Sequence, residues 1–129
     1  MKKLFISCPM KGRTEENIRK SKEKMHKIAE VVFEQELEVI PSYIEDYPPK
    51  DSHEAVWYLG ENIKLLSQAD YFIGIEYAYE YKGCAVERSF AGEYGIPSYC
   101  LPLNFIITRE EDEERKRVDA KCVCDYGQA

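Results

Sequence analysis

The chain lacks an apolar run long enough to cross a bilayer, which needs about 20 consecutive residues. Its start, Met1 to Ser7, carries two lysines, but the apolar stretch after them is too short for a signal peptide. An excess of basic residues is also missing, because 18 Lys and Arg stand against 24 Asp and Glu, a formal net charge of −6. We therefore expect a cytoplasmic protein with neither a membrane nor a nucleic-acid polymer as partner.

The cysteines form no disulfide or metal-binding pattern. Their number is odd, and they are scattered at positions 8, 84, 100, 122 and 124. Reduced thiols are the simplest interpretation. Cys122 and Cys124 lack the second ligand pair of a zinc site, and His26 and His53 are far away in sequence. We expect neither a metal nor another cofactor.

Apolar strand-like segments alternate with helical ones along the 129 residues. Strands are predicted at residues 3–7, 39–41, 71–75 and 97–101. Helices are predicted after Thr14 and Ser52, which are suitable N-caps, and over residues 85–94, with Gly95 as the C′ residue. The alternation predicts one domain over residues 1–129. Its fold is a three-layer α/β fold, Rossmann-like or flavodoxin-like, with a four- to five-stranded, mainly parallel sheet.

A charged helix and a tail are expected at the C-terminal end, residues 109–129. Thr108 and Glu111 have the spacing of a capping box, and the helix should run to about Asp119. Glu111 and Arg115 have i,i+4 spacing and are expected to pair on a solvated face. Residues 121–126 are either a fifth strand at the sheet edge or a tail.

One carboxylate, Glu87, follows the apolar strand at 71–75 after a short loop. If the helix begins at Ala85, Glu87 lies in its first turn, where the backbone dipole favours the ionised form. Gly83 permits close approach of a ligand, and the same helix start should lower the pKa of the Cys84 thiol. An ionised carboxylate at the carboxyl end of a parallel sheet can attack an anomeric carbon. Alternatively, Glu87 is an ordinary first-turn glutamate without a ligand.

Two motifs carry a resemblance to a known family. Ala69 to Ile75 with Gly83-Cys84-Ala85-Val86-Glu87, and Ala91-Gly92-Glu93-Tyr94-Gly95-Ile96-Pro97, resemble the nucleoside 2-deoxyribosyltransferases and the related deoxynucleoside monophosphate N-glycosidases. The similarity covers about residues 3–101 and is greatest to a branch of small bacterial and phage proteins. It implies that Glu87 attacks C1′ of a nucleoside or nucleotide and forms a glycosyl-enzyme, which water or a second base then resolves.

The position of the family's general acid departs from this pattern. An Asp is expected eight residues before Asp70, where this chain has Asn62, with Glu61 beside it. Asn can hydrogen-bond a departing base but cannot give it a proton. Three alternatives follow: Glu61 takes the acid's place by a shifted register, the leaving group needs no acid, or the protein binds without cleaving.

Two loops are further candidates for contact with substrate. Residues Ser7, Pro9, Met10, Lys11, Gly12 and Arg13 match the family's ligand-facing loop, and the amides and cations of 11–13 suit a phosphate. The other interpretation of 11–13 is a solvated basic turn. Three alternating tyrosines follow the 71–75 strand, and they could stack on a base or form a subunit contact. They are Tyr77, Tyr79 and Tyr81.

The sequence thus supports three hypotheses. The first is an N-glycosidase or deoxyribosyltransferase that acts on a nucleoside or nucleotide. The second is a nucleotide-binding or sequestering protein with the same pocket and weak or no catalysis. The third is a structural subunit in which Glu87 has no ligand. A homodimer or higher homo-oligomer is expected in each case, because Val56, Leu59, Ile63 and Leu66 form an apolar helix face and the family completes its pockets across subunits.

Overall fold

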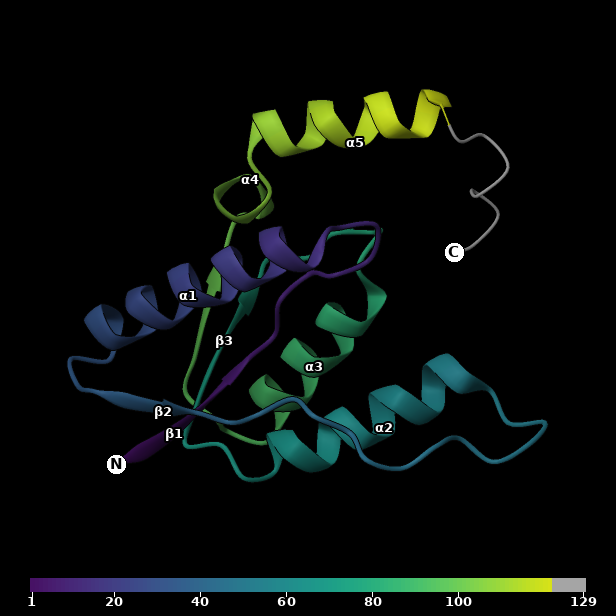
Figure 1. The fold of residues 1–129 in the computed structure, drawn as a ribbon. Coiled ribbons are helices and arrows are strands. Elements are labelled where there is room, and N and C mark those ends of the chain that lie inside the picture. Colours follow the sequence, from purple (N-terminus) through teal and green to yellow (C-terminus); the bar gives the residue numbers. More distant parts are fainter. Residues whose placement is uncertain (122–129) are drawn as a thin grey trace.

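The computed structural model describes residues 1–121, and its side chains over residues 1–117 (Figure 1). The strands are β1 (Lys2–Ile6), β2 (Leu37–Val39), β3 (Tyr71–Ile75) and β4 (Ser98–Leu101). The helices are α1 (Glu15–Val32), α2 (Glu54–Leu66), α3 (Lys82–Glu93), α4 (Leu103–Ile106) and α5 (Arg109–Lys121). Apart from Lys121, which ends α5, the predicted strand or tail at 121–126 lies outside the described residues.

The four strands form one parallel sheet in the order β2-β1-β3-β4. Leu4 of β1 pairs with Val39 on one side and with Tyr71 of β3 on the other. The predicted α/β fold with a mainly parallel sheet is therefore confirmed, with four strands. Strand β2 lies on one side of β1, and β3 and β4 lie on its other side. The order of the strands therefore reverses between β1 and β3, which makes this place a topological switch point. Open α/β sheets bind their ligands at such a point, at the carboxyl ends of the strands.

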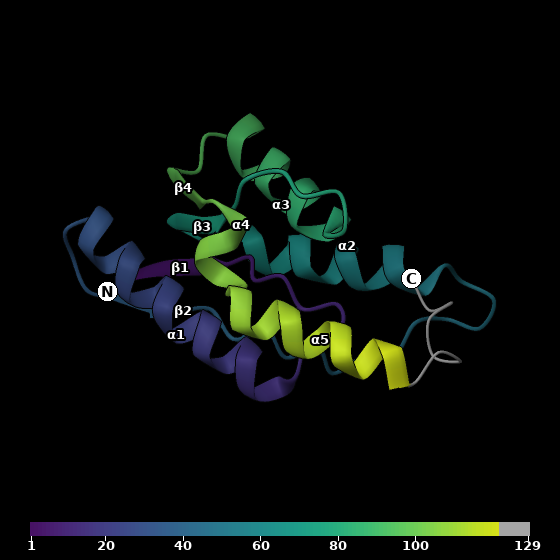
Figure 2. The ribbon, with the colours of Figure 1, turned by 90° about the horizontal axis from the view of Figure 1, so that it is seen from above.

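Alternation along the strands creates two apolar layers. On one face Leu4 and Ile73 pack with Met25 and Ala29 of α1. On the other face a second cluster contains strand and helix residues together: Phe5, Phe72, Leu66 of α2 and Ala91 of α3. Figures 1 and 2 show α1 on one side of the sheet and α2 and α3 on the other. None of the described helices is long and apolar enough to span a membrane.

After β4 the chain crosses to the α1 side and then covers the carboxyl end of the sheet. Ile106 at the end of α4 is buried, and its carbonyl accepts a hydrogen bond from Ser21 Oγ of α1 at 3.5 Å. From there α5 runs beside the N-terminal half of α1 (Figure 2). The helix thus lies next to the loop between β1 and α1, which was predicted to face a ligand.

The predicted helix boundaries are partly correct. Thr14 caps α1 by accepting from Asn17 N at 3.1 Å, and Gly95 ends α3 with φ 75°. Ser52, however, donates to the Pro49 carbonyl at 2.6 Å, and His53 is the N-cap residue of α2. Helix α3 begins at Lys82, three residues before the predicted Ala85.

The second strand also differs from its prediction. It spans Leu37–Val39 rather than residues 39–41. Ile40 N still donates to Leu4 O at 2.9 Å, but Pro41 has no N–H with which to continue the ladder. The strand therefore ends before the proline.

Gly74 of β3 provides a test of packing beside the switch point. A Cβ there would lie 2.7 Å from Cε1 of Phe72, which is fully buried and stacked on Phe5. We expect Gly74→Ala to lower the free energy of unfolding by about 1–3 kcal/mol, because the ring has nowhere to move. The measurement is urea unfolding followed by circular dichroism.

Gly60→Ala is the matched control. Gly60 lies inside α2, and a Cβ there meets nothing within 4 Å. This change should stabilise the protein by roughly 0.5–1 kcal/mol, because alanine loses less backbone entropy in a helix. Equal effects at the two positions would contradict the packing argument.

Candidate functional site

Ser7 and Glu87 meet at the switch point. Ser7 follows β1, and its backbone N–H donates to Ile73 O of β3 at 2.8 Å. Its hydroxyl donates to Glu87 Oε1 of α3 at 2.6 Å, although the two residues are 80 positions apart. Ser7 is 2% exposed and Glu87 7% exposed. The pair therefore lies in the interior, at the edge of the sheet where the fold places ligands.

The electrostatic state of Glu87 differs from the prediction. Because α3 begins at Lys82, Glu87 is in the second turn of the helix, where the dipole effect has largely faded. Burial raises the pKa of the Glu87 carboxyl above its usual range, and the Ser7 hydrogen bond opposes this rise. Among the described side chains no cation forms an ion pair with it. The dominant influence is therefore desolvation rather than the helix dipole.

The predicted reactivity of Cys84 is wrong for the same reason. Burial raises the pKa of the Cys84 thiol to about 12, and the hydrogen bond with Ser7 lowers it only in part. Such a thiol stays protonated at neutral pH. Within the described residues, no three His, Cys, Asp or Glu side chains are placed to hold a metal ion, and Cys122 and Cys124 lie outside that range.

The Arg13 side chain is buried against α5. Its guanidinium is 0% exposed and forms two bonds with Glu111 of α5, Nε to Oε2 at 2.6 Å and Nη2 to Oε1 at 2.8 Å. Further bonds go to the Pro9 carbonyl at 2.8 Å and to Ser21 Oγ at 2.7 Å. The arginine predicted for phosphate thus fixes α5 to the β1–α1 loop. Lys11 is exposed and is the remaining side-chain cation of that loop.

Two predictions for Glu111 are corrected by this ion pair. Glu111 pairs with Arg13 and not with Arg115. Only half of the predicted capping box forms, since Glu111 N donates to Thr108 Oγ1 at 3.2 Å while its carboxylate turns to Arg13. Glu111 pairs with Arg13 rather than with Arg115 because the buried charge of Arg13 needs a counter-ion.

Of the three tyrosines after β3, only Tyr81 points inward. Tyr77 and Tyr79 are 66% and 72% exposed, whereas Tyr81 is 6% exposed. The Tyr81 hydroxyl donates to the Lys11 carbonyl at 3.4 Å and accepts from Arg115 Nη1 at 3.3 Å. It thus joins the two loops at the carboxyl edge to α5.

Gly83 and Met10 both border open space. Gly83 is the second residue of α3, and a Cβ there would meet nothing within 4 Å. The packing of the described residues therefore does not require a glycine at this position. Met10 is 49% exposed, while the neighbouring Pro9 is buried.

Neither candidate acid contacts Glu87. Asn62 is half-buried on α2, and no hydrogen bond joins it to Glu87 among the described residues. Glu61 Oε2 instead pairs with Lys64 Nζ at 2.7 Å on its own helix. Glu61 lines a hollow of about 280 Å³ with Tyr43 and Ile44, away from the Ser7–Glu87 pair. A shifted register that brings Glu61 to the site is therefore absent from this conformation.

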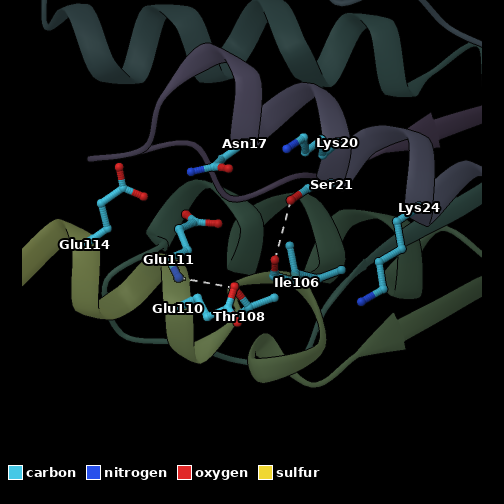
Figure 3. A pocket seen from close by; sticks show the side chains of 9 residues that line it. All are labelled: Asn17, Lys20, Ser21, Lys24, Ile106, Thr108, Glu110, Glu111 and Glu114. Atoms are coloured by element: carbon cyan, nitrogen blue, oxygen red, sulfur yellow. Dashed lines mark hydrogen bonds between the residues drawn. The ribbon is translucent and has the colours of Figure 1, made fainter.

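Two cavities flank α5. One of about 370 Å³ lies between α1 and the α4–α5 segment, and its lining includes Lys20 and Lys24 of α1 and Glu110 and Glu114 of α5 (Figure 3). The other, of about 530 Å³, is lined by Tyr81 and by Arg109, Asp112 and Arg115 of α5. Both cavities border the part of α5 that carries Glu111 and Arg115.

No protein-family model matches the chain, and neither the curated proteins nor the solved structures contain a match. The resemblance given above therefore stays a prediction, and what the site does is inferred from its geometry.

The prediction missed Arg115, which lies beyond the motifs that carry the resemblance. Its guanidinium comes close to Gly12, since Nη2 would be 3.1 Å from a Cβ built there. The only sequence signal was its place four residues after Glu111, and that spacing indicated a different partner.

A pH dependence of stability follows from the buried carboxyl. The folded pKa of Glu87 lies above the unfolded value, so its contribution to stability is complete below the unfolded pKa. That contribution is lost as the pH rises through the folded value. We expect Glu87→Gln to flatten this part of the curve and Ser7→Ala to steepen it, as measured by urea unfolding from pH 4 upward. Parallel curves for the wild type and Glu87→Gln would be inconsistent with a desolvated carboxyl.

A second prediction concerns the ion pair that holds α5. Glu111→Ala leaves the Arg13 guanidinium without its counter-ion and should lower the free energy of unfolding by about 3 kcal/mol. This value is the lower end for a broken buried ion pair, because α5 can undock and let water reach Arg13. Glu113→Ala removes an exposed partner of the 93% exposed Arg109 and should change stability by less than about 0.5 kcal/mol. Chemical unfolding measures both, and a Glu111→Ala effect as small as that of Glu113→Ala would contradict the argument.

Proposed function

We propose that the chain is an N-glycosidase or deoxyribosyltransferase that acts on a nucleoside or nucleotide, with Glu87 as nucleophile. The observation that supports this most is the Ser7–Glu87 hydrogen bond of 2.6 Å at the β1–β3 switch point. Glu87 is buried without a cationic partner among the described side chains, and burying a carboxylate in this way costs free energy. A role in catalysis therefore explains its position better than a contribution to stability does. The sequence motifs around Glu87 point to the same reaction.

In this reaction the two carboxylate oxygens have separate roles. Oε1 accepts the Ser7 hydrogen bond, so Oε2 remains to attack C1′. As the new C–O bond forms, the bond from C1′ to the base breaks and its electron pair leaves with the base nitrogen, which takes up a proton from water. The oxygen of a water molecule, or the nitrogen of a second base, then attacks C1′, gives up its proton to water and releases the carboxylate. Because Glu87 is only 7% exposed, a substrate can reach Oε2 only when the surrounding loops open.

The same pocket used for binding alone is the second candidate. It is favoured by the lack of an acid near Glu87 among the side chains of residues 1–117, since Asn62 cannot donate a proton and Glu61 is paired with Lys64. A bound nucleotide would then be held without cleavage. Asn62→Asp separates the candidates, because a gain in base release would indicate that only the acid is missing.

Association of copies and a cytoplasmic location remain part of the proposal. The apolar face of α2 is partly used within the chain, where Leu66 is buried and Ile63 packs against the core. Val56 on the same helix is 59% exposed and is free to contact a second copy.

The decisive measurement is release of free base from 2′-deoxynucleosides and their 5′-monophosphates, followed by chromatography. We expect Glu87→Gln to lower the rate by on the order of 10³-fold or more, and Ser7→Ala by roughly 10- to 100-fold. The wild-type rate should increase with pH, with a midpoint above the usual pKa of glutamate, as Glu87 loses its proton.

Glu93→Gln, an exposed position at the end of α3, is the control and should leave the rate unchanged. Base release at the wild-type rate by a folded Glu87→Gln variant would exclude Glu87 as nucleophile. Binding of nucleotide without any release by the wild type would support the second candidate instead.

A further inference from the structure

Helix α5 connects the two loops at the carboxyl edge of the sheet. Its Glu111 binds Arg13 of the loop between β1 and α1. One turn later, Arg115 Nη1 donates at 3.3 Å to the hydroxyl of Tyr81, which ends the loop between β3 and α3 and is the N-cap residue of α3. The first loop follows β1 directly, and α3 carries Glu87. The helix therefore joins the two segments from which the candidate site is built.

The Arg13–Glu111 pair is linked to the site through contacts within the β1–α1 loop. Arg13 Nη1 donates to the Pro9 carbonyl at 2.8 Å and lies 3.8 Å from Cys8 Sγ. Cys8 is the next residue after the serine that donates to the Glu87 carboxyl. The guanidinium thus holds the backbone and a side chain of the segment beside the carboxyl, and loss of its ion pair with α5 frees that segment.

The connection that leads into α5 covers the same region. Ile107, which precedes the helix, belongs to the same buried cluster as Cys8 and Cys84. Cys84 lies three residues before Glu87 on α3, so both are on one face of that helix. Glu87 itself is only 7% exposed. The β4–α5 connection, the β1–α1 loop and α3 therefore close over the carboxyl together.

Apolar packing does not hold the described part of α5 in place. Residues 109–117 are all charged, and Glu111 is the one buried side chain among them. Cavities of about 370 and 530 Å³ border the two flanks of the helix. A segment with few buried apolar contacts opens at a lower free energy than the whole domain unfolds. Docking of α5 thus depends on its ion pair far more than the sheet layers do.

We propose that α5 is a clasp over the candidate site, and that the Arg13–Glu111 ion pair is the latch of this clasp. With the latch closed, the Glu87 carboxyl is shut off from ligands. When the pair separates, α5 undocks, the β1–α1 loop is released, and a molecule the size of a nucleoside can reach Oε2. The inference rests on the proposed function for the identity of that ligand, whereas the opening itself is measured without one.

Two thiols of the chain report on the opening. Cys8 and Cys84 are buried beside the site, whereas Cys100 packs in the cluster on the other face of the sheet and is the internal reference. Each protein is treated with N-ethylmaleimide, and mass spectrometry of its peptides gives the modification rate of every thiol. The wild type is compared with Glu111→Ala, in which the latch is removed.

Two further variants are controls. Glu113→Ala removes a carboxylate of the same helix that pairs only with the exposed Arg109. Gly74→Ala is expected to weaken the core by overpacking without touching α5. Rates are measured at several low urea concentrations, because a local opening exposes little surface and responds weakly to urea, whereas global unfolding responds steeply.

We expect Glu111→Ala to raise the modification rates of Cys8 and Cys84 on the order of 10²-fold, with little dependence on urea, because the latch supplies most of the free energy of docking. Cys100 in this variant, and all three thiols in Glu113→Ala, should react at wild-type rates. Gly74→Ala should act only through the urea-dependent route. Unchanged protection of Cys8 and Cys84 in Glu111→Ala, or reactivity that increases equally at Cys100 and steeply with urea, would overturn the inference.

The clasp and the proposed reaction fail in different ways. If only open molecules bind substrate, Glu111→Ala should lower KM for base release by a factor similar to the gain in thiol modification. If modification increases as expected but no variant releases base, the clasp is supported and the glycosidase or transferase reaction is excluded. If base is released in a Glu87-dependent manner, and neither modification nor KM responds to Glu111→Ala, the reaction is supported and the clasp is wrong.

Discussion

The parallel pairing of β1 with β3 is the constraint on which the site depends. It brings the end of an N-terminal strand next to the end of a strand that begins some 70 residues later, with Phe5 opposite Phe72 and Ile6 opposite Ile73. Ser7 continues this pairing by donating to Ile73 O. Its side chain then faces α3, the helix that follows β3. The hydroxyl and the Glu87 carboxyl meet because the sheet has this strand order, and no local feature of either segment would bring them together.

Local patterns were enough to predict the layers, because a strand or helix is recognised from neighbouring residues. Short apolar runs identified the four strands, and Thr14 and Gly95 marked helix ends by chemistry that acts within a few residues. The start of α3 was missed because its N-cap residue, Tyr81, makes no side-chain capping bond. A helix that begins without a capping side chain has no such signal in the sequence. That error of three residues placed Glu87 in the wrong turn.

The sequence predicted which residues form the candidate site better than it predicted their burial, protonation and partners. Glu87 and Ser7 were both expected at the site, and the structure brings them together. The protonation of Glu87, however, depends on how much of its side chain is covered by distant parts of the chain. The same holds for Arg13, whose partner Glu111 is 98 residues away and cannot be inferred from spacing. Long-range burial and pairing were therefore the part that the sequence could not predict.

The way α5 is attached has a consequence for the order of assembly. Every residue from 109 to 117 is charged, so this part of the helix has no apolar side chain with which to join the core. It depends on Arg13, which is synthesised almost a hundred residues before its counter-ion. On the ribosome, therefore, the guanidinium has to stay hydrated until Glu111 has emerged. Helix α5 can therefore dock over the carboxyl edge of the sheet only after residues 109–117 have been synthesised.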